Sequence, residues 1–221
     1  MNDIAGRTVL ITGASGALGS GLVQEFAAAG ATVVGVGRGE PTDPVGGVRY
    51  ERTDVGSDSE VAALFERVGT PWAVVNTVGG FAGHRPFARL DSEELSKQLF
   101  LNLTTAAIIT KYALRAMQEA GEGRIVHTAS RAATDTSGAG FAYSVSKVGV
   151  LQLVRMASEE VADTRIRVNA VSPSIIDTPA NRAAMPNADH ASWPKIPDIA
   201  QAYLFLASPE AALVNGASLP V

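Results

Sequence analysis

Three residues in the second half of the chain have the types and spacing for proton-transfer chemistry. Tyr143 and Lys147 lie four positions apart, and Ser130 lies thirteen positions before the tyrosine. A helix through this segment places the phenol and the ammonium on one face, because four residues are slightly more than one turn. A nearby positive charge stabilises a phenolate, so we expect Lys147 to lower the pKa of Tyr143 from about 10. Tyr143 would then act as a general acid or base, while the Ser130 hydroxyl orients a carbonyl oxygen.

The scaffold decides whether this pair is functional, because a tyrosine and a lysine at this spacing also form ordinary surface contacts. Apolar runs alternate with amphipathic stretches along the 221 residues, which is typical of strands buried beneath helices. We expect one domain over residues 1–221, a Rossmann fold of the α/β class with a doubly wound, seven-stranded parallel sheet and helices on both faces. The expected strands are 8–11, 32–36, 48–52, 72–76, 124–128, 166–171 and 217–220. The expected helices are one that follows the loop of residues 12–19 and ends near 29, 58–68, 92–119, one that carries Tyr143 and ends near 162, and 198–207.

Residues 174–197 interrupt this alternation. They are rich in Pro, Asn, Asp and Ala and include Met185 and Trp193. Long loops in compact domains are often functional, so the segment is either a substrate lid or a surface excursion packed by its own Trp193.

Composition narrows the possible partners. The net charge is −4 and there is no cysteine, so we expect neither nucleic-acid binding nor disulfides and thiolate metal sites. No apolar run approaches the ~20 residues of a membrane helix, and the N-terminus lacks the pattern of a targeting signal. We therefore expect a cytoplasmic protein that acts on small molecules without membrane contact. His84, His127 and His190 are too scattered to predict a metal site.

A glycine-rich loop after the first expected strand predicts a dinucleotide site. Gly13, Gly16 and Gly19 lie between a strand and a helix, where backbone amides can approach a pyrophosphate and the helix N-terminus favours negative charge. Glycines also serve plain turns, but the strand–loop–helix context favours binding. After the second strand, Gly37 and Arg38 stand where NAD sites usually have a carboxylate for the adenosine ribose. We expect NADP(H) rather than NAD(H), with Arg38 on the 2′-phosphate unless it is a solvated loop residue.

These motifs, in this order, resemble those of the short-chain dehydrogenase/reductase family. Residues 12–19 are similar to the family loop Thr-Gly-x-x-x-Gly-x-Gly, although Gly16 comes one place early and Ala17 stands where the middle glycine usually is. Residues 76–79 resemble the family's Asn-Asn-Ala-Gly motif, and residues 173–174 resemble its Pro-Gly motif. The family's helix asparagine is matched by Asn102, and its serine, tyrosine and lysine by the triple described above.

The resemblance implies roles for these residues. Tyr143 would exchange a proton with the substrate oxygen, Ser130 would steady that oxygen, and Lys147 would also hold the nicotinamide ribose. Asn102 would anchor a water that passes protons to the lysine, although an asparagine here is otherwise a polar kink in the long helix. Asp54 would bond the adenine amino group, or instead cap the following helix. Besides Tyr143 and Lys147, the implied cofactor contacts are Gly13, Ser15, Gly16, Ala17, Leu18, Gly19, Arg38, Asp54, Val55, Asn76, Val78, Gly79, Pro173, Ile176 and Thr178.

The reaction implied by the resemblance is hydride transfer between the nicotinamide and a carbonyl or alcohol substrate. Residues 78–83, 177–189 and 192–194 are also similar to the dihydropteridine reductase branch, which typically lacks the serine and the helix asparagine and prefers NADH. Reduction of a quinonoid pterin is therefore the alternative, and a non-catalytic NADP(H)-binding protein is a third possibility. The resemblance further implies a homo-oligomer, a dimer or tetramer formed through the helices after the fourth and fifth strands and through the last strand.

Overall fold

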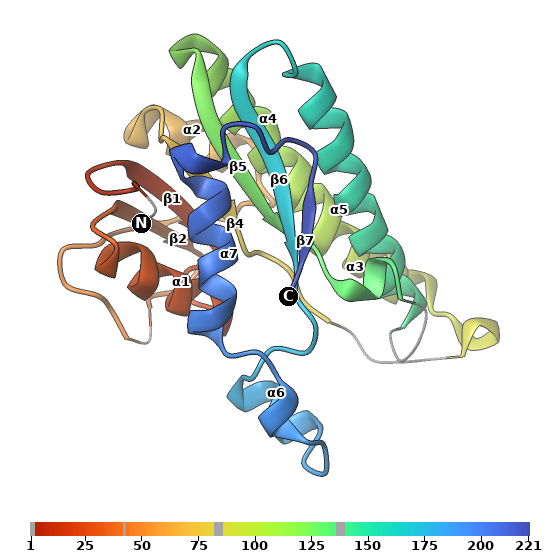
Figure 1. The fold of residues 1–221 in the computed structure, drawn as a ribbon. Helices are drawn as coiled ribbons and strands as arrows, with labels where there is room; N and C mark the ends of the chain where they lie inside the picture. The colour runs from red at the N-terminus through yellow and green to blue at the C-terminus, as the bar shows by residue number, and fades with distance from the viewer. Residues whose placement is uncertain (1–2, 42, 82–85, 136–139) are drawn as a thin grey trace.

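A seven-stranded sheet forms the middle layer of the molecule (Figure 1). All its strands are parallel and lie in the order β3-β2-β1-β4-β5-β6-β7, which confirms the predicted doubly wound α/β fold. The computed structural model describes residues 3–41, 43–81, 86–135 and 140–221. The strands are β1 (Thr8–Thr12), β2 (Thr32–Gly37), β3 (Arg49–Arg52), β4 (Ala73–Asn76), β5 (Glu122–Thr128), β6 (Arg165–Ser172) and β7 (Ser218–Pro220).

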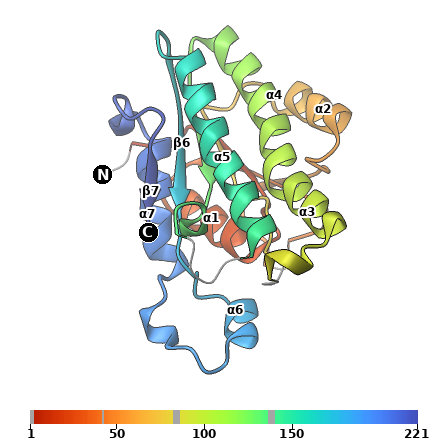
Figure 2. The same ribbon diagram turned by 90° about the vertical axis from the view of Figure 1, so that its right-hand side faces the viewer.

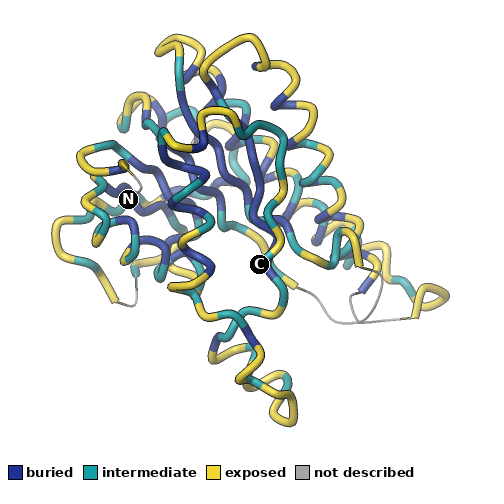
Figure 3. Tube along the Cα trace, in the orientation of Figure 1, coloured by how far each residue is buried: buried dark blue, intermediate teal, exposed yellow. Residues whose placement is uncertain are grey.

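Helices cover both faces of the sheet. On one face lie α1 (Ala17–Ala28) and α7 (Ile196–Ala207), and on the other lie α2 (Asp58–Val68), α4 (Thr105–Ala120) and α5 (Phe141–Glu160). Figure 2 shows the second group side by side. A separate apolar cluster fills the space between the sheet and the helices on each face, so the central strands are buried on both sides. Figure 3 shows that the buried residues concentrate in the sheet. This burial explains the continuous apolar runs of the sequence.

The long helix predicted over 92–119 contains a change of winding. It comprises α3 (Ser92–Leu99), a π-helical turn over Phe100–Thr104, and α4, which is followed by Gly121 with φ of +80°. Short π segments inside α-helices bend the axis and are frequent at functional sites. Asn102 is buried within this turn. The change of winding therefore lies at Asn102, where a polar kink was the alternative to a role in the site.

Residues 174–197 contain more regular structure than expected. The short helix α6 (Pro179–Ala184) and a 3₁₀ turn (His190–Ser192) lie in this segment, which projects from the body of the molecule (Figures 1 and 2). Trp193 is only 9% exposed, and its ring lies 4.6 Å from that of His190. In the part of the chain that the structure describes, no helix has the length and apolar character needed to span a membrane.

Candidate active site

A cleft of about 660 Å³ opens where β4, β5 and β6 end. The carboxyl ends of parallel strands meet at one edge of a sheet, which is where ligands bind in open α/β folds. Residues predicted from four separate parts of the sequence line this cleft: Gly79, Ser130, Tyr143, Lys147, Pro173 and Ile176. The fold therefore brings the predicted proton-transfer triple together.

Tyr143 lies in the first turn of α5, and its phenol is hydrogen-bonded to the Ser130 side chain. The rings of Tyr143 and Phe81 pack edge to face, with their centroids 5.2 Å apart. Burial raises the pKa of Tyr143 above its usual value, and the Ser130 hydrogen bond opposes this only in part. Our expectation of a lowered pKa is therefore wrong for this structure, because a buried phenolate loses its hydration.

Lys147 lies one turn further along α5 and is 3% exposed. Its Nζ donates to the Thr128 carbonyl at 2.8 Å and lies 5.9 Å from the centre of the Tyr143 ring. Burial lowers the pKa of Lys147 to about 8, because an ammonium in the interior lacks solvation. Both side chains line the cleft, as the spacing of four residues predicts.

Asn102 holds the loop after β4 through its carboxamide. Its Oδ1 accepts from the Gly80 amide at 2.9 Å, and its Nδ2 lies 3.0 Å from the Gly80 carbonyl. The same Nδ2 lies 3.1 Å from Gln98 Oε1 and 3.1 Å from Ser146 Oγ. The carboxamide thus joins the π turn to the loop and to α5, and its predicted role in holding a water stays a prediction.

Gly79 lies where a side chain could not fit. A Cβ at this position would lie 2.6 Å from Asn102 Oδ1 and 3.1 Å from Lys147 Nζ. The loop therefore approaches the lysine closely because residue 79 has no side chain. Asn76 and Val78, the other predicted residues of this loop, do not line the cleft, and the Val78 amide is 3.3 Å from Asn76 Oδ1.

The glycine loop has the close packing that a dinucleotide site requires. Gly13 has φ of +76°, and a Cβ at Gly19 would lie 2.0 Å from the Gly13 carbonyl oxygen. Gly16 begins α1 without a side-chain cap, and the first turn, which starts with Ala17 and Leu18, carries no acidic residue. The N-terminus of α1 is thus open to a negatively charged group, so the loop fits a pyrophosphate.

A smaller recess of about 100 Å³ lies beyond this loop and includes the predicted residue Ser15. Arg38 follows β2 directly and is exposed, but it does not line the recess. Arg52, at the end of β3, does line it, and so does Glu40. Within the described residues neither arginine makes a side-chain hydrogen bond or ion pair. The sequence analysis did not select Arg52. Its position at the carboxyl end of an expected strand is the signal that could have placed it near this recess.

Asp54 follows β3 and its Oδ1 accepts from the Gly56 amide at 2.9 Å. The helix α2 is capped instead by Ser57, whose hydroxyl accepts from the Glu60 amide. The alternative that Asp54 caps this helix is therefore wrong, and its contact with adenine stays a prediction. Val55 is buried next to it.

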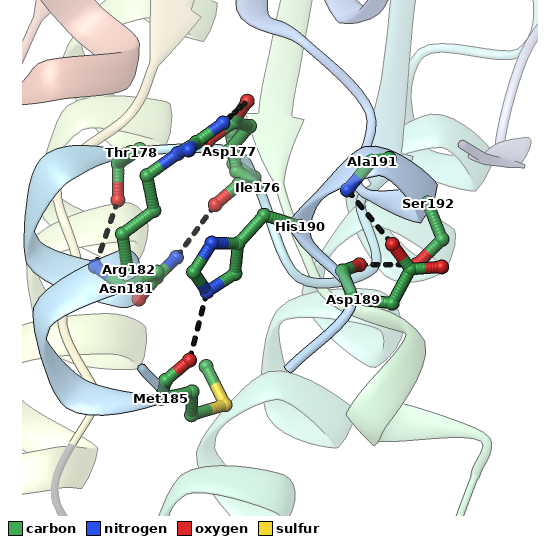
Figure 4. A network of polar contacts seen from close by, with 10 residues as sticks. All are labelled: Ile176, Asp177, Thr178, Asn181, Arg182, Met185, Asp189, His190, Ala191 and Ser192. Carbon is green, nitrogen blue, oxygen red and sulfur yellow. Dashed lines mark hydrogen bonds and ion pairs between the residues drawn. The ribbon is translucent and has the colours of Figure 1, made fainter. Parts of the chain in front are cut away.

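The segment that contains α6 is held by its own polar contacts (Figure 4). Arg182 forms a two-bond ion pair with Asp177, at 2.6 and 2.9 Å. His190 Nε2 donates to the Met185 carbonyl at 2.8 Å, and Asn181 Nδ2 donates to the Ile176 carbonyl at 2.8 Å. These contacts give the segment a defined shape.

Asn181 and Met185 of this segment, to which the sequence assigned no contact with cofactor or substrate, line the cleft. Thr178 does not line the cleft, and its hydroxyl caps α6 by accepting from the Asn181 amide at 3.2 Å. The Pro173 carbonyl accepts from the Arg131 amide at 3.0 Å, which ties the loop after β6 to the segment that follows Ser130.

The two histidines that the structure describes lie in different parts of the fold. His127 is fully buried in β5, His190 lies in the α6 segment, and His84 is outside the described residues. Burial, and to a smaller extent the charge of Lys147, lowers the pKa of His127 to about 3. Among the residues that the structure describes, no three His, Cys, Asp or Glu side chains form a metal-binding group.

Comparisons with known proteins agree with this geometry. Residues 13–221 match a family model described as enoyl-(acyl carrier protein) reductase. The cis-4-hydroxycyclohexanecarboxylate dehydrogenase of Sinomonas cyclohexanicum is 33% identical, over 98% of this chain and 95% of its own. The 3-oxoacyl-[acyl-carrier-protein] reductase FabG of Pseudomonas aeruginosa is 30% identical, over 99% and 97%.

Solved structures give the same result. A short-chain type dehydrogenase/reductase from Mycobacterium ulcerans aligns with a TM-score of 0.89 at 30% identity, over 99% of this chain and 89% of that chain. Levodione reductase aligns with a TM-score of 0.90 at 27% identity, over 99% and 96%. The chain therefore belongs to the short-chain dehydrogenase/reductase family and is an oxidoreductase that uses a nicotinamide cofactor.

Proposed function

We propose that the protein is an NADP(H)-dependent oxidoreductase that transfers hydride between the nicotinamide and a carbonyl or alcohol substrate. One observation carries this proposal: Ser130, Tyr143 and Lys147 line one cleft, at the same edge of the sheet as the glycine loop. The bound nicotinamide would supply or accept the hydride. The residues of this chain would bind the substrate oxygen and move its proton.

The raised pKa of Tyr143 suits the direction of reduction. A phenol whose pKa lies above 10 is protonated at neutral pH, so it can give its proton to the alkoxide that forms on the substrate. The Ser130 hydroxyl, already bonded to the phenol, would hold the same oxygen. The phenolate left behind would be stabilised by the nearby ammonium of Lys147.

The preference for NADP(H) is supported by arginines at the adenosine end. Arg38 is exposed directly after β2, and Arg52 lines the recess there. A guanidinium binds a phosphate through two parallel hydrogen bonds. Glu40 lines the same recess and would repel a phosphate, so we assign the preference to the two arginines acting together.

The substrate class is supported by the apolar walls of the cleft. Phe81, Ile175, Ile176 and Met185 surround the catalytic residues. Such walls favour a ketone or alcohol with an apolar body. Two relatives, named above, act on a hydroxycyclohexanecarboxylate and on 3-oxoacyl groups carried by a protein. We therefore favour carbonyl reduction over pterin reduction. Three of these four residues, Ile175, Ile176 and Met185, belong to the segment that contains α6, and this segment is the proposed substrate lid.

A homo-oligomer, dimer or tetramer, is part of the proposal. Val145, Val148 and Met156 on α5 are 36%, 48% and 65% exposed. Apolar side chains that gather on one helix are typical of an interface. The paired helix of a second copy would cover them.

The role of Tyr143 can be tested by removing only its hydroxyl. Tyr143→Phe keeps the ring and its contact with Phe81 but cannot donate a proton, so kcat should fall roughly 10²-fold or more. NADPH oxidation would be followed with cyclic ketones, 3-oxoacyl thioesters, quinones and quinonoid pterins. Tyr112→Phe, which removes a surface phenol bonded to Asp58, is the matched control. Full activity in Tyr143→Phe would exclude the role, and NADPH binding without turnover on any substrate would favour a non-catalytic protein.

The pH dependence of the reaction should report Lys147. Because its pKa is about 8, the Lys147 amine is mostly protonated at neutral pH and loses its proton as the pH rises through 8. The value of kcat/KM for NADPH, which reports groups of the free enzyme, should therefore fall above about pH 8. In Lys147→Arg the guanidinium stays charged, so the remaining activity should lack this decline. The same decline in both proteins would show that another group titrates.

Cofactor choice can be tested at Arg38 and Arg52. Arg38→Ala should lower kcat/KM for NADPH about tenfold or more, because a charge-assisted bond to the phosphate is lost, with little change for NADH. Arg52→Ala should shift the ratio in the same direction. Arg165→Ala is the control, because Arg165 is the first residue of β6 and lies at the amino end of that strand, away from the recess. Equal losses with both cofactors, or none, would reject the assignment.

The oligomer can be tested by its mass in solution. Light scattering should give a multiple of the 22.9 kDa chain. Met156→Glu places a charge on the exposed face of α5 and should dissociate the assembly, whereas Leu213→Glu, at a residue 96% exposed, is the comparison variant. A wild-type mass of one chain would disprove the proposal.

A further inference from the structure

His127 is a buried, titratable residue for which the proposed chemistry has no use. It lies in β5 directly opposite Asn76 in β4 and is 0% exposed. Its Nδ1 lies 3.3 Å from Asn76 Nδ2, and its Nε2 lies 2.9 Å from Thr110 Oγ1 on α4. The imidazole thus joins a helix on one face of the sheet to the strand that leads into the cofactor loop.

The hydrogen bonds around His127 determine where its proton lies. The Thr110 hydroxyl donates to the Ala106 carbonyl at 2.6 Å, so its oxygen is free to accept from the imidazole. The Val78 amide donates to Asn76 Oδ1, which orients the carboxamide so that its nitrogen faces His127. An amide nitrogen can only donate. Nδ1 must therefore accept and Nε2 must carry the hydrogen, and both ends of the network require this same neutral form.

The network continues from His127 to the site. Asn76 Oδ1 accepts from the Thr12 hydroxyl at 2.6 Å as well as from Val78, so one carboxamide joins β1, the strand before the glycine loop, to the loop after β4. The far end of that loop is held by Asn102 through Gly80. The loop residue between these two anchors is Gly79, which lies against Lys147.

Charge on the imidazole would disturb this arrangement. An imidazolium has no acceptor, so Nδ1 could no longer accept from Asn76. The charged group that acts on His127 is Lys147, and it opposes protonation together with burial. The surroundings therefore keep the imidazole in the form that the hydrogen bonds require.

We propose that His127 is a positioning residue: its neutral imidazole fixes Asn76, and through Asn76 the loop of residues 77–80, in the shape that binds the nicotinamide half of the cofactor. This inference rests on the proposed function. The competing explanation is that His127 only fills a polar space in the core. The two differ in which of its two hydrogen bonds matters for the cofactor.

Two substitutions each keep one of these bonds. In His127→Asn the side-chain oxygen lies near the place of Nδ1 and can still accept from Asn76. In His127→Gln the side-chain nitrogen reaches towards Thr110, and the acceptor for Asn76 is lost. If His127 positions the loop, the Kd for NADPH, measured by fluorescence titration, should rise about tenfold or more in His127→Gln and less than about threefold in His127→Asn. KM for NADPH should follow Kd, with a smaller change in kcat.

A second pair of variants tests the same network from α4. Thr110→Val removes the acceptor of the Nε2 hydrogen and allows the imidazole to adopt the other tautomer, so NADPH affinity should fall. Thr105→Val is the matched control, because this buried hydroxyl on the same helix donates to the Leu101 carbonyl in the same way but does not contact His127. In the His127→Asn background, Thr110→Val should have no further effect on affinity, since asparagine does not reach it.

The tautomer can be observed directly in the wild-type protein, whatever the stability of the variants. Nitrogen NMR of the imidazole at pH 7 should show hydrogen on Nε2 and none on Nδ1. An imidazolium, the opposite tautomer, or equal losses of NADPH affinity in His127→Asn and His127→Gln would overturn the proposal while leaving the proposed function intact. Wild-type protein that binds neither NADPH nor NADH would overturn both.

Discussion

The buried ammonium of Lys147 sets the conditions for the rest of the site. Burying a charge costs several kcal/mol unless polar groups surround it. The protein meets part of this cost with the Thr128 carbonyl at 2.8 Å, and the remaining cost is visible in a pKa lowered to about 8. The carbonyl is available because β5 ends there, and α5 brings the lysine to it. The absence of a side chain at Gly79 then lets the cofactor loop approach within contact distance.

Two parts of the structure near this lysine are held by separate sets of contacts. One is a layer of buried polar groups, Thr12, Asn76, His127 and Thr110, that crosses the sheet where β1 and β4 end. The π turn fixes the same loop from the other side through Asn102. The α6 segment, by contrast, takes its shape from internal contacts such as the Arg182–Asp177 pair. In the proposed mechanism, variation in this segment would change the substrate without disturbing the residues that move the proton.

The sequence predicted the order of strands and helices and that Ser130, Tyr143 and Lys147 share one site, because these follow from periodicity and from motifs whose spacing is local. It predicted a lowered pKa for Tyr143, whereas the structure raises it, because the burial of this phenol depends on packing by Phe81 and other distant segments. The π turn was predicted only as a kink at Asn102. The partners of His127 come from β4 and α4, so no pattern around residue 127 could indicate them. Arg52 was not selected from the sequence because the recess that it lines is formed by three separate segments.

The central claim is that a protonated phenol and a buried ammonium share one site with the nicotinamide ribose. A crystal structure of the protein with bound NADP⁺ tests it most directly. We predict that the ribose hydroxyls lie within about 3 Å of Lys147 Nζ and of the Tyr143 hydroxyl, with the nicotinamide ring beside Ser130. A cofactor whose nicotinamide half lies away from this cleft, or whose ribose does not contact Lys147, would contradict the account.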